Sequence, residues 1–180
     1  MVCFSRGCCQ RSLTENPGHL TVTTQAGDSY ESINSIKNVF LQDSPSGDFE
    51  ITTKLNAAVQ NNHEQAGLYI WQDEDNYIRF GHVWDNGLKL ETAKEEAGKY
   101  SKAQNMAQHP GDHTVYLKVK KTGNAYSTFF WMNGKWEKAA DPITSTINVS
   151  KVGIYGTSTQ SGKNVKASFD YFTLQSLQKE

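Results

Sequence analysis

Hydrophobic and polar residues alternate along most of this chain. From Phe49 to Leu55 every second residue is apolar or threonine, and the residues between them, from Glu50 to Lys54, are polar. This period of two predicts a strand with one face in a core and the other in water. The same alternation recurs in residues 65–72 and 77–84, which the acidic turn at 73–76 joins into a hairpin.

Further strands are expected wherever the alternation returns between turn residues. Asn86-Gly87 is a strong hairpin signal, because both residue types accept a positive φ at low cost. The remaining expected strands cover residues 88–92, 113–121, 124–132, 135–138, 151–157 and 166–177. Residues 94–106 are the only candidate helix, but they lack an apolar stripe and are expected to form an exposed excursion. The chain is therefore predicted to be all-β, a single antiparallel β-sandwich or jelly roll.

The composition argues against nucleic-acid and membrane partners. The 180 residues carry a formal net charge of −1, which leaves no basic field for nucleic acid. No run approaches the roughly 18 apolar residues of a membrane span, so no membrane partner is expected. Asn, Gln, Ser and Thr are abundant, which suits an extracellular or cell-surface β-protein.

All three cysteines, Cys3, Cys8 and Cys9, lie in the first nine residues. An odd number with two adjacent members predicts no disulfide framework, and the spacing lacks the ligand pairs of a zinc site. Residues 1–12 are expected to be a poorly structured segment with no signal peptide, and residues 13–178 the folded domain.

The order of several short motifs resembles the concanavalin A-like β-sandwich at the C-terminus of family-43 β-xylosidases. The matching strings are ENPGHLTV at 15–22, NVFLQD at 38–43, SGDFEI at 46–51, QAGLY at 65–69, DNYI at 75–78, KVGIY at 151–155 and FDYF at 169–172. NGKW at 133–136 departs from the family's Asp-Gly-x-x-Trp. The family's usual first strand is replaced by the cysteine-rich opening, so an edge strand is expected to be missing.

This resemblance implies a domain that binds glycan or braces a neighbouring catalytic domain, and that is not itself the catalyst. It also implies a concave sheet with an outward-facing groove. If Leu68 and Ile70 face the core, Tyr69 and Trp71 face outward; burial of Ile78 exposes Tyr77 and Arg79 in the same way.

The sequence thus predicts an open aromatic face for sugar. Aromatic rings stack on the apolar face of a pyranose while charged and amide groups bond its hydroxyls. The alternative is that a loop, residues 94–106 or a partner domain covers this face. The expected binding residues are Tyr69, Trp71, Tyr77, Arg79, Glu50, Lys54 and, at one end of the groove, Trp84.

Other candidates are weaker. Trp131 is expected in the core and Trp136 as a cap over a hairpin. The acidic run at 73–75 is expected to be a solvated turn, although such carboxylates can hold calcium. Asp170 is a candidate ligand of a structural Ca²⁺, implied by the resemblance, without a second ligand in view.

Catalysis needs two carboxylates across a groove. Glu50 and Glu91 are isolated candidates, and no nucleophile motif is present. Together with the resemblance, which implies an accessory module of a glycoside hydrolase, this predicts non-catalytic binding of a plant or microbial polysaccharide. Two alternatives remain: a glycoside hydrolase acting on a β-glycan with an unrecognised carboxylate pair, and a bracing domain cut from a larger enzyme.

Overall fold

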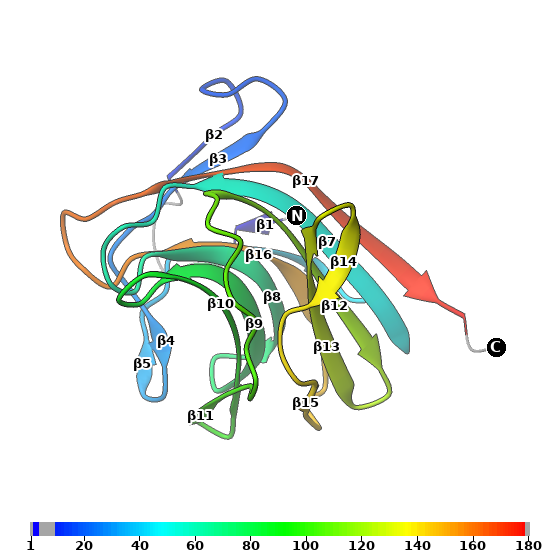
Figure 1. Ribbon diagram of the computed structural model, residues 1–180. Coiled ribbons are helices and arrows are strands. Elements are labelled where there is room, and N and C mark those ends of the chain that lie inside the picture. The colour runs from blue at the N-terminus through cyan, green and yellow to red at the C-terminus, as the bar shows by residue number, and fades with distance from the viewer. Residues whose placement is uncertain (1, 4–9, 179–180) are drawn as a thin grey trace.

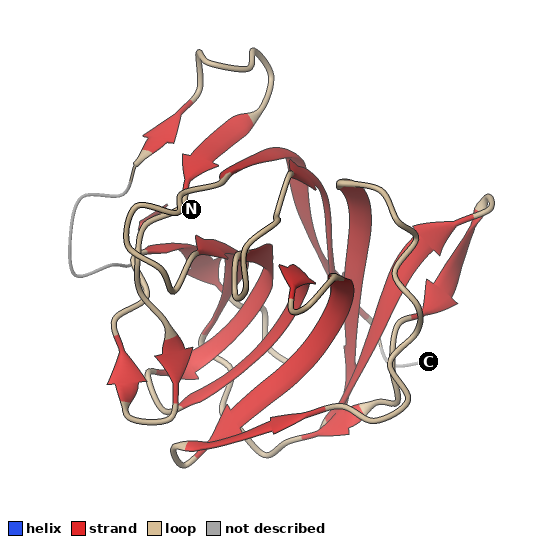
Figure 2. Cartoon of the chain, turned by 60° about the vertical axis from the view of Figure 1, so that its left-hand side comes forward, coloured by secondary structure: helices blue, strands red, loops and turns tan. Residues whose placement is uncertain are grey.

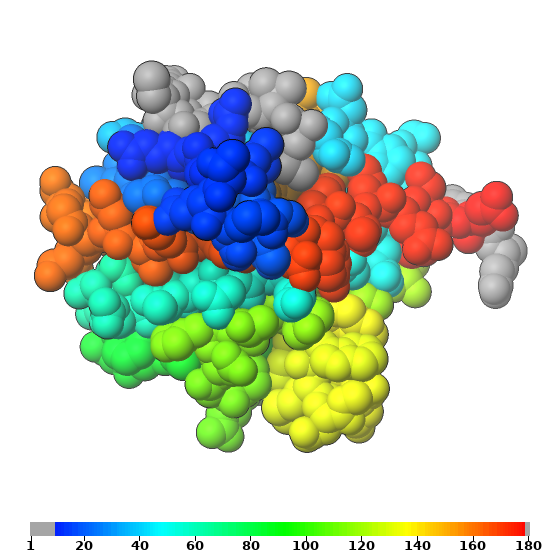
Figure 3. All heavy atoms as spheres, turned by 90° about the horizontal axis from the view of Figure 1, so that it is seen from above, coloured from blue at the N-terminus to red at the C-terminus, as the bar shows by residue number. Residues whose placement is uncertain are grey.

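Two antiparallel sheets stacked face to face make up the computed structural model, which describes residues 2–3 and 10–178 (Figure 1). Sheet A has the strand order β1 (Val2–Cys3), β6 (Asn38–Asp43), β16 (Lys151–Thr157), β8 (Gln65–Asp73), β9 (Asn76–Trp84), β10 (Leu88–Glu96) and β11 (Lys99–Lys102). Sheet B has the order β14 (Lys135–Lys138), β13 (Ala125–Met132), β12 (Thr114–Thr122), β7 (Asp48–Ala57), β17 (Lys166–Leu177), β3 (Leu20–Thr23) and β2 (Arg11–Ser12), and β15 (Ile143–Thr144) pairs with β13. In the view of Figure 3, β3 and β17 run side by side although they come from opposite ends of the chain.

The main core lies between the two sheets. Phe49 and Ile51 of β7 pack in one cluster with Leu68 and Ile70 of β8 and with residues of eight other strands. The residues between them on each strand face away from this core, as the period of two predicts. The predicted all-β sandwich is confirmed. The described residues form strands, turns and loops, and none of them belongs to a helix that could span a membrane.

Residues 94–106 do not form the expected excursion. β10 continues to Glu96, the chain turns at Ala97 and Gly98 with φ of 52° and 70°, and β11 returns along β10. The high helix propensity of Ala, Lys and Glu is overridden because pairing between β10 and β11 favours the sheet.

A small hairpin covers the outer face of sheet A (Figure 2). It consists of β4 (Ser29–Tyr30) and β5 (Ile33–Asn34). The Glu31 amide donates to Glu95 Oε2 over 2.7 Å, and Asn34 Nδ2 donates to Asp75 Oδ1 over 3.1 Å. These contacts hold the hairpin against β10 and the turn between β8 and β9.

Short strands occur in the described part of the amino-terminal segment. Val2–Cys3 pairs with β6 and Arg11–Ser12 pairs with β3, so the described part of this segment adds an edge strand to each sheet. Cys8 and Cys9 lie outside the described residues.

Candidate functional site

The aromatic face predicted from the sequence points outward but is not open to solvent. Tyr69 and Tyr77 lie on the outer face of sheet A, outside the main core, in a cluster of their own. Both are 0% exposed and Arg79 is 5% exposed. The prediction of an open face is wrong, because the segment around the β4–β5 hairpin folds over these side chains, as the alternative of a covering loop anticipated.

The other predicted residues are spread over the molecule. Trp71 is half-buried at the edge of the Tyr69 cluster, with ring centroids 5.8 Å apart, and Trp84 packs against the main core. Glu50 and Lys54 lie on β7, on the outer face of sheet B. They are on the opposite side of the molecule from Arg79, because the chain crosses from one sheet to the other between β7 and β8.

A cavity of about 250 Å³ opens beside the hairpin on the outer face of sheet A. Its walls come from the hairpin region and from four strands of the sheet. The lining residues are Asp28, Tyr30, His63, Gln65, Arg79, Val83, Glu91, Tyr100 and Lys102.

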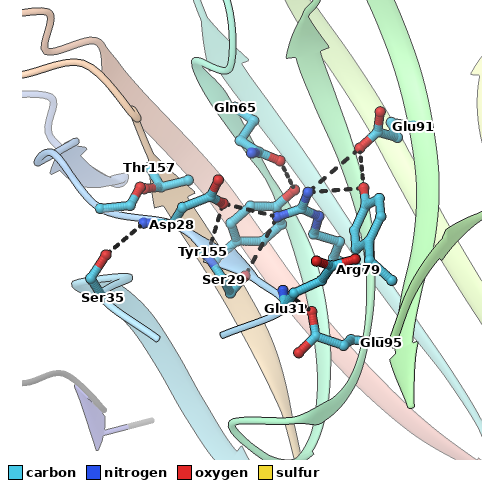
Figure 4. A network of polar contacts seen from close by, with 12 residues as sticks. Asp28, Ser29, Glu31, Ser35, Gln65, Arg79, Glu91, Glu95, Tyr155 and Thr157 are labelled. Carbon is cyan, nitrogen blue, oxygen red and sulfur yellow. Dashed lines mark hydrogen bonds and ion pairs between the residues drawn. The ribbon is translucent and has the colours of Figure 1, made fainter. Parts of the chain in front are cut away.

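Arg79 is the centre of this cavity (Figure 4). Its Nη2 donates to the Tyr100 hydroxyl over 3.0 Å, and its guanidinium lies 5.1 Å from the centre of that ring. Asp28 Oδ1 lies 3.6 Å from Nη1, and Glu91 Oε1 lies 3.6 Å from Nη2. Arg79 Nε has no hydrogen-bond partner among the residues that the structure describes. Three neighbours therefore fix the guanidinium, while its Nε–H donor is left for a ligand.

Glu91 is held just as firmly. It accepts a hydrogen bond from the Tyr100 hydroxyl over 2.8 Å and forms an ion pair with Lys102 Nζ. Tyr100 also packs against Tyr30 of the hairpin, with ring centroids 4.9 Å apart. The hairpin, β10 and β11 thus share one set of contacts around the cavity.

The charges in the cavity shift the pKa values of its groups. Burial acts to raise the pKa of Glu91, but the hydrogen bond from Lys102 and the charge of Arg79 outweigh it and hold that pKa below its usual value. Burial alone would lower the pKa of Arg79, yet the neighbouring tyrosines and Glu91 raise it. Both side chains are therefore ionised at neutral pH.

A second layer of polar contacts supports the cavity from below. The Tyr155 hydroxyl donates to Gln65 Oε1 over 3.0 Å, and the Thr157 hydroxyl donates to the Gly27 carbonyl over 2.7 Å. Ser35 Oγ accepts from the Asp28 amide over 3.1 Å. The Thr157 bond ties the segment before the hairpin to β16, and the Ser35 bond ties it to the segment after the hairpin, so that together they place the Asp28 carboxylate (Figure 4).

The cavity offers opposed charges, aromatic edges and amide groups within one small space. Such a set can hydrogen-bond several hydroxyls in fixed directions, since the charged groups already hold one another in place. Of the residues around this cavity, the sequence pattern predicted Arg79 as a binding residue and Glu91 as an isolated catalytic candidate. Tyr100 and Lys102 were not predicted. The turn at Ala97-Gly98 was the signal that could have placed them, because it brings β11 alongside β10.

The expected metal ligand Asp170 has an ammonium partner. Lys54 Nζ lies 2.9 Å from its Oδ2, and His19 Nε2 lies 3.9 Å from its Oδ1. The described residues contain no group of three or more His, Cys, Asp or Glu side chains suited to a metal. The hydrogen bond from Lys54 lowers the pKa of Asp170, which fits an ion pair on the surface of sheet B.

The candidate carboxylates Glu50 and Glu91 do not form a pair. Glu50 faces outward from sheet B and is 3.1 Å from Lys118 Nζ, whereas Glu91 faces outward from sheet A. The two sheets and the core lie between them.

The stacked sheets define a concanavalin A-like β-sandwich domain. Residues 9–175 match the family described as the β-xylosidase C-terminal concanavalin A-like domain, and the chain belongs to this family. No curated protein matches the chain.

Solved structures show the same fold in different settings. The GH43 protein BlXynB of Bacillus licheniformis superposes with a TM-score of 0.83 at 21% identity, over 93% of this chain and 35% of that one. The chain thus spans about a third of that relative. A functionally unknown protein from Saccharomyces cerevisiae superposes with a TM-score of 0.72 at 14% identity, over 99% of this chain and 96% of that one. The carbohydrate-binding module CBM66 from Bacillus subtilis superposes with a TM-score of 0.57 at 15% identity, over 94% and 92%.

Proposed function

We propose that this domain binds a neutral carbohydrate without cleaving it, as an accessory domain of a GH43-type glycoside hydrolase at an extracellular location. The ligand site is the cavity around Arg79 on the outer face of sheet A. The family and the fold shared with a carbohydrate-binding module support this proposal.

The observation that carries the proposal is the fixed polar set in the cavity. Arg79 and Lys102 offset the charges of Asp28 and Glu91, so a neutral ligand is favoured over a charged one. The volume of about 250 Å³ is below the roughly 300–1,000 Å³ of pockets for drug-sized ligands, and therefore suits one or two sugar rings.

The same geometry argues against a hydrolase at this site. A glycosidase needs one carboxylic acid that can give a proton to the leaving group. The Lys102 and Arg79 contacts lower the pKa of Glu91 and keep it ionised. Glu91 is therefore suited to accepting hydrogen bonds from hydroxyls and not to acid catalysis.

The test compares two lysines on one strand. Lys102 lines the cavity, whereas Lys99 is exposed on β11 outside it. We expect Lys102→Ala to weaken binding about tenfold, the effect of losing one charge-assisted hydrogen bond of roughly 1.4 kcal/mol. Affinity electrophoresis and calorimetry against xylans, arabinans, β-glucans, mannans and their short oligosaccharides measure this.

The matched variant Lys99→Ala should bind like the wild type. Equal affinity of the two variants for every ligand bound would contradict the cavity as the site. Release of reducing sugar by the purified domain would favour the hydrolase alternative instead.

The bracing role is the second candidate, because the chain spans about a third of the GH43 protein it resembles. It predicts that no glycan in the panel binds, and that the domain associates with a catalytic domain supplied as a separate chain. Size-exclusion chromatography of the mixture distinguishes this from glycan binding.

A further inference from the structure

A row of aromatic side chains crosses the outer face of sheet B, on the side opposite the cavity. Trp136 of β14 pairs with Trp131 of β13. Leu117 of β12 pairs with Phe130 of β13. Because these strands are antiparallel, Tyr116, just before Leu117, lies beside Trp131, just after Phe130. Lys54 of β7 then pairs with Tyr116 on one side and with Tyr171 of β17 on the other. We call these five residues the aromatic row.

Two rings of the aromatic row are exposed to solvent. Trp131 is 42% exposed and Tyr171 is 36% exposed, in contrast to the buried tyrosines of sheet A. The expectation that Trp131 lies in the core is wrong, because β13 places Phe130 inward and Trp131 outward. β17 and the β13–β14 segment lie on the same side of the molecule, coloured red and yellow in Figure 3.

The rings are held in place by their neighbours. Trp131 and Trp136 meet edge to face with ring centroids 5.4 Å apart, and Lys118 Nζ lies 4.3 Å from the centre of the Trp136 ring. Lys54 Nζ lies 5.6 Å from the centre of the Tyr116 ring. A ligand that stacks on this row therefore meets rings that are already ordered, which reduces the entropy cost of binding.

A polar pocket of about 270 Å³ adjoins the row at Lys54. Asn16, His19, Asn56, Thr114 and Asp170 line it together with Lys54. Asn16 Nδ2 donates to Ser168 Oγ over 2.9 Å, and Asn56 Nδ2 donates to Thr114 Oγ1 over 2.8 Å. Amide and hydroxyl groups thus lie beside the aromatic row, and both kinds of group are used in sugar recognition.

The charge of this face fits an uncharged ligand. Lys54 pairs with Asp170 over 2.9 Å, and Lys118 pairs with Glu50 over 3.1 Å. Because each lysine beside the rings has a carboxylate partner, the row offers little attraction to a polyanion such as nucleic acid. Charge complementarity therefore favours a neutral glycan chain.

We propose that the aromatic row and its polar pocket form a second carbohydrate-binding surface, which takes a stretch of a neutral polysaccharide chain lying across the strands. Strands are about 4.8 Å apart, so the three steps from Trp131 to Tyr171 span roughly 14 Å, a length that several sugar rings cover. An open row of this kind binds internal stretches of a chain, in contrast to the enclosed cavity on sheet A. The two sites share no residue, so an experiment can contradict one proposed site without contradicting the other.

The test uses the Lys102→Ala protein, in which the first cavity is impaired. We expect the Lys102→Ala protein to retain affinity for neutral polysaccharides of the same panel. Adding Trp131→Ala to it should lower this affinity at least tenfold. Tyr171→Ala should weaken binding at the other end of the row. Since Trp131 is exposed, polysaccharide should also protect it from quenching of its fluorescence by acrylamide.

Trp131→Phe, which keeps a ring, should retain most of the affinity. Met106→Ala removes another exposed apolar side chain away from the row and should change nothing. Unchanged affinity in Trp131→Ala, together with tryptophan quenching in the protein that retains Trp131 that polysaccharide does not alter, would overturn the proposal. A dimer of the wild type that Trp131→Ala dissociates, without any polysaccharide binding, would also overturn it by making the row a contact between two copies.

Discussion

Two histidines form a buried chain of hydrogen bonds at one end of the sandwich. His82 is fully buried, and its Nε2 lies 2.9 Å from the Ala57 carbonyl, so this nitrogen is the donor. Its Nδ1 therefore accepts from His109 Nε2 over 2.8 Å, and His109 Nδ1 accepts from the Gly111 amide over 2.9 Å. The two bonds accepted by Nδ1 atoms require neutral imidazoles, so the complete chain forms only when both rings are neutral.

Acid should therefore destabilise the fold. Burial, followed by the nearby charge of His109, lowers the pKa of His82 from 6.5 to about 4. Between these two values the unfolded state binds more protons than the folded state, so the free energy of unfolding falls as the pH is lowered from about 7 to 4. For His82 alone this loss is about 3 kcal/mol. Urea unfolding at a series of pH values measures it.

The variant His109→Gln tests the origin of this dependence. Its amide can still donate to His82 but does not titrate, so the loss of stability below pH 6.5 should become shallower. His63→Gln, outside the chain of bonds, should follow the wild-type curve. If His109→Gln and the wild type lose stability in parallel, His109 takes no part in the acid dependence.

At the scale of the elements, β16 shows how closely neighbouring strands approach one another. It lies between β6 and β8 in sheet A. A Cβ built at Gly153 would lie 1.9 Å from the Phe40 carbonyl oxygen, whereas one built at Gly156 would meet nothing closer than 3.4 Å. The first position thus requires glycine because backbone atoms of β6 occupy the space of a side chain.

Gly153→Ala should consequently lower the free energy of unfolding by 2 kcal/mol or more, roughly the cost of overpacking a core. Gly156→Ala, three residues away on the same strand, should cost less than about 1 kcal/mol. Thermal and denaturant unfolding of the two variants compare them directly. Equal effects would show that the approach of Phe40 does not constrain β16.

The period of two was sufficient to predict most of the long strands. It placed Leu68 and Ile70 inward and Tyr69 outward correctly, because adjacent residues of a strand face opposite sides whatever the rest of the chain does. It did not predict β11, because residues 94–106 are rich in helix-forming types and this strand is stabilised by its pairing with β10. Local pattern and propensity report only on neighbours along the chain.

For the whole molecule, the two proposed sites lie on opposite outer faces of one sandwich. The cavity opens from sheet A and the aromatic row from sheet B. A single molecule could then hold two polysaccharide chains at once, which is the geometry of a cross-linking lectin.

We therefore expect the wild-type domain to raise the light scattering of a soluble polysaccharide that binds both sites. Lys102→Ala and Trp131→Ala should each reduce the rise, since each weakens one of the two sites, while Lys99→Ala should preserve it. Strong binding by the wild type without any rise in scattering would show that only one face is used.

The sequence by itself determined the fold class, the family and the direction of most side chains relative to their own strand. These properties follow from a repeat of two residues and from short motifs, which depend on local geometry. Only the tertiary structure decided which outward face meets water. The β4–β5 hairpin, far from Tyr69 and Tyr77 in the chain, covers the aromatic face of sheet A. β7 belongs to sheet B and β9 to sheet A, so Glu50 and Lys54 lie far from Arg79 and beside the aromatic row. The sequence pattern could not show this, because sheet order is set by contacts between distant strands.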